Sequence, residues 1–337
     1  MRVLSWNVRG MGTPRTRLGI KKALHLHQPY LFFCCETKMT ARQVDATYGS
    51  FNFENRFVVD RIGMGGGLAL FWSSDVDVTI KSFSSHHIDA IVQNQSGKIW
   101  RCTGIYGHAE ASQKHHTWAL LKMLAELYSY NWCCLGDFNE ILYSHEKLGA
   151  NDHSSNMMSE FRESIRACNL MDMGYKEHKY TWSNRRYEDN FIEETLDRVF
   201  CSKDWSSTFQ NLPATSLVNW VSDHCPIMFE VKDCCKKLNY KKNFFPRDHY
   251  EDMWSSYEVC SNIVRSEWES FSGRRWESPV QNFQRVAQRS LAHLKIWSKE
   301  EFEGRKKKQN ELIDRLKMAK QKPPQAIDGE EIRKLED

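Results

Sequence analysis

Residues 134–139, "CLGDFN", place a carboxylate and an amide two residues apart at the end of an apolar run. The run begins at Trp132, and an apolar run of this length is typical of a buried strand. Asp and Asn are poor strand formers, so Asp137 and Asn139 are expected where the strand leaves the sheet. Side chains two apart in an extended segment point the same way, so this pair can bind a metal or hold a water. The alternative is a plain turn, which both residue types also favour.

Six other residues of suitable chemistry lie at or near the ends of apolar segments. They are Asn7 after "VLSW", Glu36 after "LFFCC", Tyr106 after "CTGI", Asp197 within "TLDRVF", and Asp223 with His224 after "SLVNWVS". Each alone has a structural explanation, such as a turn, a helix cap or a buried histidine. Amides, carboxylates, a tyrosine and a histidine gathered at strand ends together predict a metal-dependent hydrolytic site.

The elements that must position these residues alternate between short strands and helices from Met1 to about Val231. Strands are expected over residues 2–8, 31–37, 56–61, 66–72, 76–83, 88–93, 101–106, 131–139, 179–184, 195–201 and 214–231. Helices are expected over residues 17–27, 114–130 and 157–170, the last capped by Ser154 or Ser155. Meander and crossover connections occur together, which predicts an α/β fold with two packed sheets and helices outside.

The C-terminal third has a different character. Residues 232–277 are basic and irregular and are interpreted as a linker with a partly helical segment. Residues 278–337 form a charged helical tail, in which Ser278 is the expected N-cap and Pro279 the first helical residue. Such helices cannot bury a core alone, so we expect this tail to pack on another surface.

The composition is that of a soluble globular protein. The chain has 337 residues, of which 41% are hydrophobic and 27% charged, which is enough for a domain of about 230–250 residues and an appendage. A net charge of +4 does not by itself indicate nucleic-acid binding. No apolar run approaches the ~20 residues of a membrane span, and the N-terminal strand has no apolar leader. We therefore expect a nuclear or cytoplasmic protein that is not secreted and has no membrane partner.

The eleven cysteines are interpreted as reduced thiols. Cys34, Cys35, Cys133 and Cys134 lie inside apolar runs, and neither a CxxC pair nor a zinc-ligand spacing occurs. Buried cysteine behaves as a small apolar residue, and an odd number without an export signal argues against a disulfide framework.

Six motifs in order, "LSWNVRG", "CCETK", "GIYG", "LGDFNE", "LDR" and "SDHCPI", resemble the endonuclease/exonuclease/phosphatase family. The resemblance covers Met1 to about Val231. The variants "NVRGMG", "YTWSNRR" and "LDRVFCSKDW" are similar to the endonuclease domain of plant-type LINE (non-LTR) retrotransposons, and the tail resembles the stretch that precedes their reverse transcriptase. The resemblance implies a four-layer α/β/β/α sandwich and Mg²⁺-dependent hydrolysis of DNA phosphodiesters.

The motif positions imply specific roles. Mg²⁺ prefers a few hard oxygen ligands and retains waters, so Glu36 and Asn7 are expected to hold it, with Mn²⁺ as an alternative ion. Asp223 is expected to bind a second metal or to fix its loop. Nicking would leave a 3′-hydroxyl, and DNA is the expected partner. The sequence makes no prediction of oligomeric state.

The catalytic residues are expected to be Asp137, Asn139, His224, Asp197 and Tyr106. Either Asp137 or His224 would accept a proton from the attacking water, with Asp137 favoured because a protonated His224 cannot accept one, and Asn139 would direct that water. His224, held by Asp197 and therefore more easily protonated, would oppose charge on the phosphate. Tyr106 would hydrogen-bond the phosphate or assist the leaving oxygen.

DNA contacts are expected from Lys38, Trp182, Asn184, Arg185 and Arg186. The alternative for each of these residues is an ordinary solvated surface position.

Two positions depart from the family pattern. Arg9 stands where many members carry Asp, and Gly107-His108 stands where many carry Pro-Asn. A phosphatase or phosphodiesterase acting on another ester, and a silent DNA- or partner-binding remnant, are therefore alternative functions.

Overall fold

The computed structural model describes residues 1–48, 51, 53–149, 153–176, 178–186, 191–219, 221–234, 254, 257–271, 278–320 and 329–336. The chain divides into two compact units: residues 1–236 with 319–337, and residues 237–318. Most of the predicted linker, residues 232–277, lies outside the described residues.

The first six-stranded sheet of the larger unit has the strand order β14-β15-β1-β2-β4-β3. Its strands are β1 (Arg2–Asn7), β2 (Leu31–Cys35), β3 (Asn55–Val59), β4 (Leu68–Trp72), β14 (Thr215–Ser216) and β15 (Ile227–Glu230). Strands β1 and β2 are parallel, and the other pairs are antiparallel. The glycine-rich segment between β3 and β4 turns the chain at an isolated bridge between Ile62 and Gly65.

The second six-stranded sheet has the order β10-β13-β8-β7-β6-β5. Its strands are β5 (Asp77–Ser84), β6 (His87–Gln93), β7 (Ile99–Tyr106), β8 (Trp132–Asp137), β10 (Leu170–Asp172) and β13 (Asp197–Ser202). Here β7 and β8 form the parallel pair. A separate small sheet joins β9 (Lys147–Leu148), β11 (Trp182–Ser183) and β12 (Glu193–Glu194).

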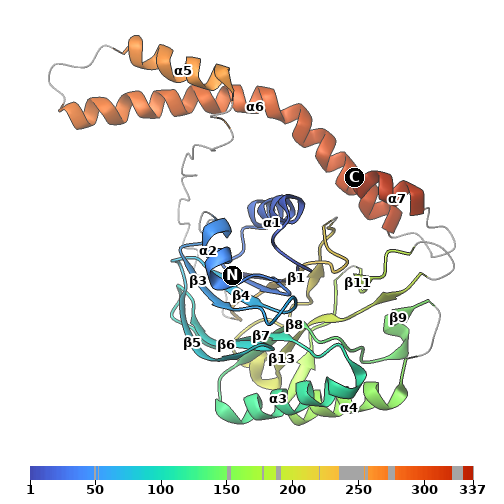
Figure 1. Ribbon diagram of the computed structural model, residues 1–337. Helices are drawn as coiled ribbons and strands as arrows, with labels where there is room; N and C mark the ends of the chain where they lie inside the picture. The colour runs from blue at the N-terminus through green and yellow to red at the C-terminus, as the bar shows by residue number, and fades with distance from the viewer. Residues whose placement is uncertain are drawn as a thin grey trace. The chain divides into compact units, whose positions relative to one another are not determined.

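Helices cover the outer face of each sheet, with α1 and α2 on one side and α3 with α4 on the other (Figure 1). They are α1 (Pro14–His27), α2 (Ala41–Tyr48), α3 (Lys114–Leu127) and α4 (Ser155–Ala167), with short 3-10 turns η1 (Ala111–Gln113), η2 (Ser144–Glu146) and η3 (Lys203–Ser207). This arrangement confirms the four-layer α/β/β/α sandwich expected from the sequence.

The strand sequences explain this layering. In β2, Leu31, Phe33 and Cys35 belong to the cluster between the sheets, whereas Phe32 and Cys34 belong to the cluster under α1 and α2. Strands buried on both faces carry continuous apolar runs instead of an alternating pattern. That is why "LFFCC" and "WCCL" contain no polar residue before the strand ends.

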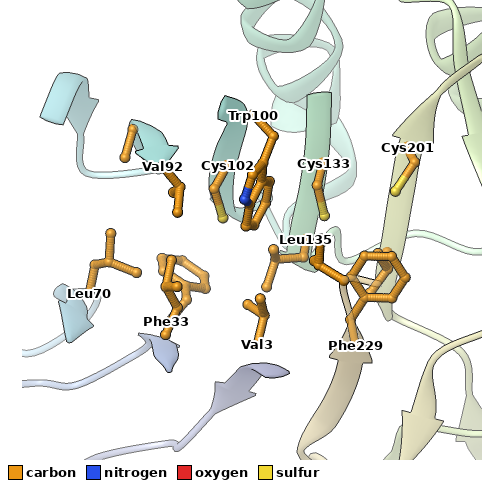
Figure 2. Close-up of a cluster of buried hydrophobic side chains, with 14 of the residues drawn as sticks. Val3, Phe33, Leu70, Val92, Trp100, Cys102, Cys133, Leu135, Cys201 and Phe229 are labelled. Carbon is orange, nitrogen blue, oxygen red and sulfur yellow. The ribbon is translucent and has the colours of Figure 1, made fainter. Parts of the chain in front are cut away.

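Figure 2 shows the central cluster, in which side chains of the two sheets face each other. Val3, Phe33 and Leu70 come from the first sheet, and Trp100 and Leu135 from the second. All of the described cysteines are free thiols, and the eight that are buried act as small apolar residues.

Two predicted strands are wrong in extent. Only Thr215–Ser216 and Ile227–Glu230 of the predicted strand 214–231 are extended, as β14 and β15, and only Trp182–Ser183 of the predicted strand 179–184. The segment between β14 and β15 carries Asn219, Ser222 and Asp223, whose side chains bond to the backbone and to neighbouring groups. Such local bonds compete with strand pairing.

The smaller unit contains α5 (Glu258–Glu269) and most of α6 (Pro279–Lys320). Its buried residues Trp254, Cys260 and Leu294 form a single small cluster. At the start of α6, the Ser278 hydroxyl accepts from the N–H of Gln281 (3.3 Å), and the Gln281 side chain accepts from the N–H of Ser278 (2.9 Å). This is a capping box, and it confirms the predicted helix start. Helix α7 (Gly329–Glu336) falls in the larger unit.

A chain ending at residue 236 is expected to fold alone and melt cooperatively. Four apolar clusters draw only on residues 1–231. The Met1 ammonium donates to the Val231 carbonyl (2.8 Å), and the Cys234 N–H donates to the Thr208 carbonyl (3.1 Å). Thermal denaturation followed by circular dichroism tests this. A control chain ending at residue 226, which lacks β15, should lose the cooperative transition. A broad melt of the longer chain would show that the C-terminal helices contribute to the core.

Candidate active site

The candidate residues gather at one edge because of the sheet topology. The parallel pairs end together, with Asn7 opposite Cys35 in one sheet and Tyr106 opposite Asp137 in the other. Strand β13 runs antiparallel to β8, so its first residue, Asp197, also pairs with Asp137. Strand β15 runs antiparallel to β1, so the segment before it, with Asp223 and His224, reaches the same edge.

The side chain of Asn7 links the two sheets. Its amide nitrogen donates to Glu36 Oε1 (3.1 Å) and to Asp137 Oδ2 (2.9 Å). Its amide oxygen accepts from the backbone N–H of Arg9 (3.1 Å). The amide would therefore have to turn over before its oxygen could ligate a metal as expected from the sequence. As it stands, Asn7 holds the two carboxylates in place.

Glu36 follows β2 and lies at the mouth of the site. Its Oε1 also accepts from the Tyr106 hydroxyl (3.1 Å), and its Oε2 lies 3.4 Å from Lys38 Nζ and 3.8 Å from Arg9 Nε. Burial, followed by the charge of Glu36, raises the pKa of the Tyr106 phenol far above its usual range. Tyr106 therefore stays protonated and keeps a hydroxyl proton that it can donate in a hydrogen bond.

Arg9 spans two of the candidate metal ligands. Its Nη1 lies 3.2 Å from Asp223 Oδ2, in addition to its contact with Glu36. Where many family members carry Asp, this chain thus places a positive charge between two carboxylates. The Arg9 side chain is about half exposed, at 48%, so it can move when another cation or a phosphate approaches.

His224 and Asp197 form a buried pair. His224 Nδ1 and Asp197 Oδ2 are 2.9 Å apart, and the Tyr175 hydroxyl donates to the Asp197 carbonyl. His224 Nε2 lies 3.9 Å from Asp137 Oδ2, too far for a hydrogen bond. A proton on Nε2 is therefore not taken up by Asp137 and can be donated to a substrate oxygen.

The pKa values of His224 and Asp137 are both raised. Burial lowers the pKa of His224, but Asp197 and Asp137 more than offset this and raise it to about 9. Burial raises the pKa of Asp137 to about 6, with His224 opposing and Asp197 adding to the shift. At neutral pH, His224 is a cation and Asp137 is a carboxylate of unusual basicity. Groups shifted in this way are typical of acid–base sites.

Backbone strain is concentrated at the same edge. Five of the seven non-glycine residues with positive φ in the described chain lie there: Arg9, Glu36, Lys38, Asn139 and Arg185. Such conformations cost of order 1–3 kcal/mol each and tend to occur at functional sites. Before Asp137, Gly136 has φ +142°, and a Cβ there would lie 2.0 Å from the Ile105 carbonyl oxygen.

The comparisons with known proteins agree with this geometry. The sequence profile described as the Endonuclease/Exonuclease/phosphatase family matches residues 4–224, which is about two thirds of the chain. This chain belongs to that family. None of the curated proteins compared with it matches. Family membership places the chain among hydrolases that act on phosphodiester bonds.

Solved structures share the fold. The 3′-5′ exonuclease NExo of Neisseria meningitidis is 16% identical over 69% of this chain and 100% of its own, with a TM-score of 0.52. The catalytic domain of Xenopus laevis APE2 is 16% identical over 69% of this chain and 92% of its own, with a TM-score of 0.54. The endonuclease domain of TRAS1, a telomere-specific non-LTR retrotransposon, is 14% identical over 68% of this chain and 97% of its own, with a TM-score of 0.54.

Enzymes of the endonuclease/exonuclease/phosphatase family are typically dependent on a divalent metal, and the residues present fit one. The donors are hard oxygens, which suit such an ion, and Asp197 Oδ1 is buried with no hydrogen-bond partner among the described residues. Ligating atoms of Asp137, Asp197 and His224 lie within 4.8 Å of one another. Because a protonated His224 cannot ligate a cation, Glu36 and Asp223 at the open side of the site are better placed to hold the ion.

The residues predicted to bind DNA are partly engaged within the protein. The Trp182 indole donates to Asp223 Oδ2 (3.0 Å), and Arg185 donates to the Ser222 carbonyl. The Asn184 side-chain oxygen accepts from the N–H groups of Arg186 and Ile192. Lys38 lies beside Glu36, and Arg186 is exposed.

Asn139 occupies an unexpected place. Its backbone N–H donates to Asp137 Oδ1 (2.9 Å), and its side-chain amide donates to the Gly107 carbonyl (2.8 Å). The pair "D-x-N" therefore also ties β8 to the loop after β7. This leaves the side-chain oxygen of Asn139 as the atom that can direct a water.

Several supporting residues were not predicted. The Trp6 indole and the Asn219 amide donate to the His224 carbonyl (3.0 and 2.6 Å). The Ser222 hydroxyl donates to the Asn7 carbonyl (2.8 Å), and the Thr181 hydroxyl accepts from the N–H of Asp197 (2.9 Å). Their position beside the motif residues, as with Ser222 in "SDH", is the only signal that the sequence offers.

None of the helices in the described part of the chain is both long enough and apolar enough to span a bilayer.

Proposed function

We propose that this chain is a divalent-metal-dependent endonuclease that nicks DNA and leaves a 3′-hydroxyl. We further propose that it is the endonuclease of a plant-type LINE retrotransposon and that it acts in the nucleus or cytoplasm. The observation that carries the proposal is the buried pair of Asp137 and His224, whose side chains face each other across 3.9 Å and whose pKa values are both raised. One group can accept a proton while the other stabilises negative charge, as phosphodiester hydrolysis requires.

In the proposed reaction, a water attacks phosphorus while the bond to the 3′ oxygen breaks. Asp137 Oδ2, oriented by Asn7 (2.9 Å), takes the proton of that water. Asn139 directs the water through its side-chain oxygen. The products are a 5′-phosphate and a 3′-hydroxyl, and the leaving 3′ oxygen takes its proton from solvent. Positioning of this kind contributes about 7–11 kcal/mol in well-aligned systems.

Charge stabilisation comes from three sides of the phosphate. His224 Nε2–H donates to a non-bridging oxygen, and Asp197 keeps the imidazolium oriented through Nδ1 (2.9 Å). Tyr106, which stays protonated, adds a second hydrogen bond. Glu36 and Asp223 would hold a divalent ion, which we propose is Mg²⁺ or Mn²⁺, and this ion would polarise the phosphate when bound. Arg9 and Lys38 lie beside Glu36. From this position their side chains can turn toward the DNA backbone.

Support for a nucleic-acid substrate comes from two neighbours. One neighbour is the endonuclease domain of TRAS1, a non-LTR retrotransposon, and one NExo structure contains a product DNA hairpin. Lys38, Arg185 and Arg186 supply positive charge near the same edge, and such charge carries most non-specific affinity for DNA.

The purified chain is expected to convert supercoiled plasmid to open circles with Mg²⁺ and to do nothing with EDTA. The nicks should be extended by a DNA polymerase without prior phosphatase treatment, because they end in a 3′-hydroxyl. Asp137→Asn, purified in parallel, controls for contaminating nucleases. Release of phosphate from a 3′-phosphorylated oligonucleotide without nicking would favour a phosphatase. Binding without either reaction would show a silent remnant.

A further inference from the structure

Four histidines form a continuous column of rings beside Tyr106. The rings of His86 and His108 are stacked, with centroids 3.7 Å apart and planes 15° apart. The outer rings are tilted instead of stacked: His116 lies 5.6 Å from His108 at 49°, and His115 lies 4.0 Å from His116 at 40°. At the other end, His86 is parallel to Tyr106 within 8°, at 5.9 Å. We call His86, His108, His116 and His115 the histidine column.

The inner end of the column is fixed by hydrogen bonds. His86 Nδ1 donates to the Tyr106 carbonyl (2.7 Å), and the N–H of Tyr106 donates to the His86 carbonyl (2.9 Å). The N–H of His108 donates to the Thr117 hydroxyl (2.9 Å), and His108 Nδ1 shares a hydrogen bond with the same hydroxyl (2.9 Å). These two bonds fix the orientation of the His108 ring.

The column is also tied to the candidate active site. Tyr106, at its inner end, donates to Glu36. Gly107 is held by Asn139, and a Cβ at Gly107 would lie 2.4 Å from the Phe138 carbonyl oxygen. The backbone that carries His108 thus packs directly on the segment that carries Asp137. The outer end, His115 and His116 at the start of α3, is exposed.

The histidine column offers aromatic ring faces to a ligand, and not a metal site or a positive charge. Among the described residues, only Asp137, Asp197 and His224 form a histidine, cysteine or carboxylate group with metal-ligand spacing, so the column is not one. Burial, followed by the neighbouring His86 and His116, lowers the pKa of His108 to about 4. His108 is uncharged at neutral pH, so it does not attract phosphate by charge.

We propose that the histidine column binds an unpaired nucleobase of the DNA next to the bond that is cut. This inference rests on the proposed function. Rows of aromatic side chains commonly serve as stacking platforms for bases of single strands. In a duplex both faces of each base are already covered, so only a displaced or mismatched base can stack on the exposed end. The enzyme would then prefer sites with an unpaired nucleotide on one side of the nick.

Fluorescence of 2-aminopurine in synthetic DNA tests this proposal. Binding is measured with the full chain in EDTA, so no cleavage is needed. The wild type is expected to quench 2-aminopurine in an unpaired position and to bind that DNA more tightly than the fully paired duplex. The double variant His115→Ala/His116→Ala should lose the quenching and bind the unpaired substrate about 5- to 150-fold more weakly. His115→Phe/His116→Phe should restore both.

The control is His25→Ala, which removes an exposed histidine of α1 and should change nothing. Equal binding of paired and unpaired DNA by the wild type, unchanged binding by the alanine double variant, or failure of phenylalanine to rescue would each overturn the proposal. Plasmid nicking is scored separately. A chain that nicks but does not quench refutes only the column, and a chain that quenches but does not nick refutes only the proposed reaction.

Discussion

Asp137→Asn is expected to reduce the rate of DNA nicking by about three orders of magnitude, within the range for loss of a general base. The substitution keeps the shape of the side chain and still lets its oxygen accept from Asn7 or from the N–H of Asn139. It removes the group that takes the proton of the attacking water. The rate is measured on supercoiled plasmid at saturating Mg²⁺, under single-turnover conditions, so that chemistry is observed instead of product release.

The same substitution is expected to leave the melting temperature unchanged or raise it. Burial raises the pKa of Asp137 to about 6, so the folded state disfavours its charged form. A carboxyl group with a raised folded pKa lowers stability above that pKa, and the loss is relieved as the pH falls through it. At neutral pH the asparagine variant escapes this cost. A large fall in melting temperature would mean that lost activity reflects unfolding, and near-wild-type nicking would refute the role of Asp137.

The layers of the fold follow from the sequence because the central strands are buried on both faces. Runs such as "LFFCC" and "WCCL" are then apolar throughout, and Glu36 and Asp137 lie where these two strands end. Two parallel pairs, β1 with β2 and β7 with β8, bring those ends to one edge. The gathering of Asn7, Glu36, Tyr106 and Asp137 at that edge was therefore within reach of sequence reasoning.

The contacts made by residues outside the two large sheets could not be predicted from the sequence. Trp182 was expected at the DNA groove, but its indole donates to Asp223, because an isolated bridge places it opposite His224. The contact of Arg9 with both Glu36 and Asp223 depends on a backbone with φ +47°. No periodicity in the sequence predicts the contact of Trp182 or the contacts of Arg9, because segments far apart in the chain determine both.

The histidine column is another feature that could not be predicted from the sequence. His86, His108 and the pair His115-His116 come from three separate segments and have no common spacing. The sequence therefore gives no reason to group these four histidines. Only the pairing of β6 with β7, in which His87 lies opposite Ile105, brings His86 next to Tyr106 and His108.

Asp197→Asn is expected to shift the alkaline limb of the pH–rate profile downward by two units or more. In the wild type, kcat/KM should rise as Asp137 ionises near pH 6 and fall as His224 loses its proton near pH 9. Burial alone lowers the pKa of His224, and the negative charge of Asp197 does more than any other group to raise it. Without that charge, the pKa of His224 is expected to fall below neutral pH, so His224 is uncharged at neutral pH and above. Nicking at pH 8 should then fall by at least about 10-fold, whereas the loss near pH 6 should be much smaller.

The pH dependence separates an electrostatic role of Asp197 from a merely structural one. A structural defect would lower the rate equally at every pH, whereas a changed His224 pKa lowers it mainly on the alkaline side. Nitrogen-detected NMR of the imidazole gives an independent measurement, because the His224 titration itself should move from near pH 9 to below pH 7. Asp204→Asn, at an exposed position in η3, is the matched control and should keep the wild-type profile. If the alkaline limb of Asp197→Asn stays near pH 9, the charged state of His224 does not depend on Asp197. The proposed roles of Asp137 as the base and of His224 as a cation held by Asp197 are then wrong.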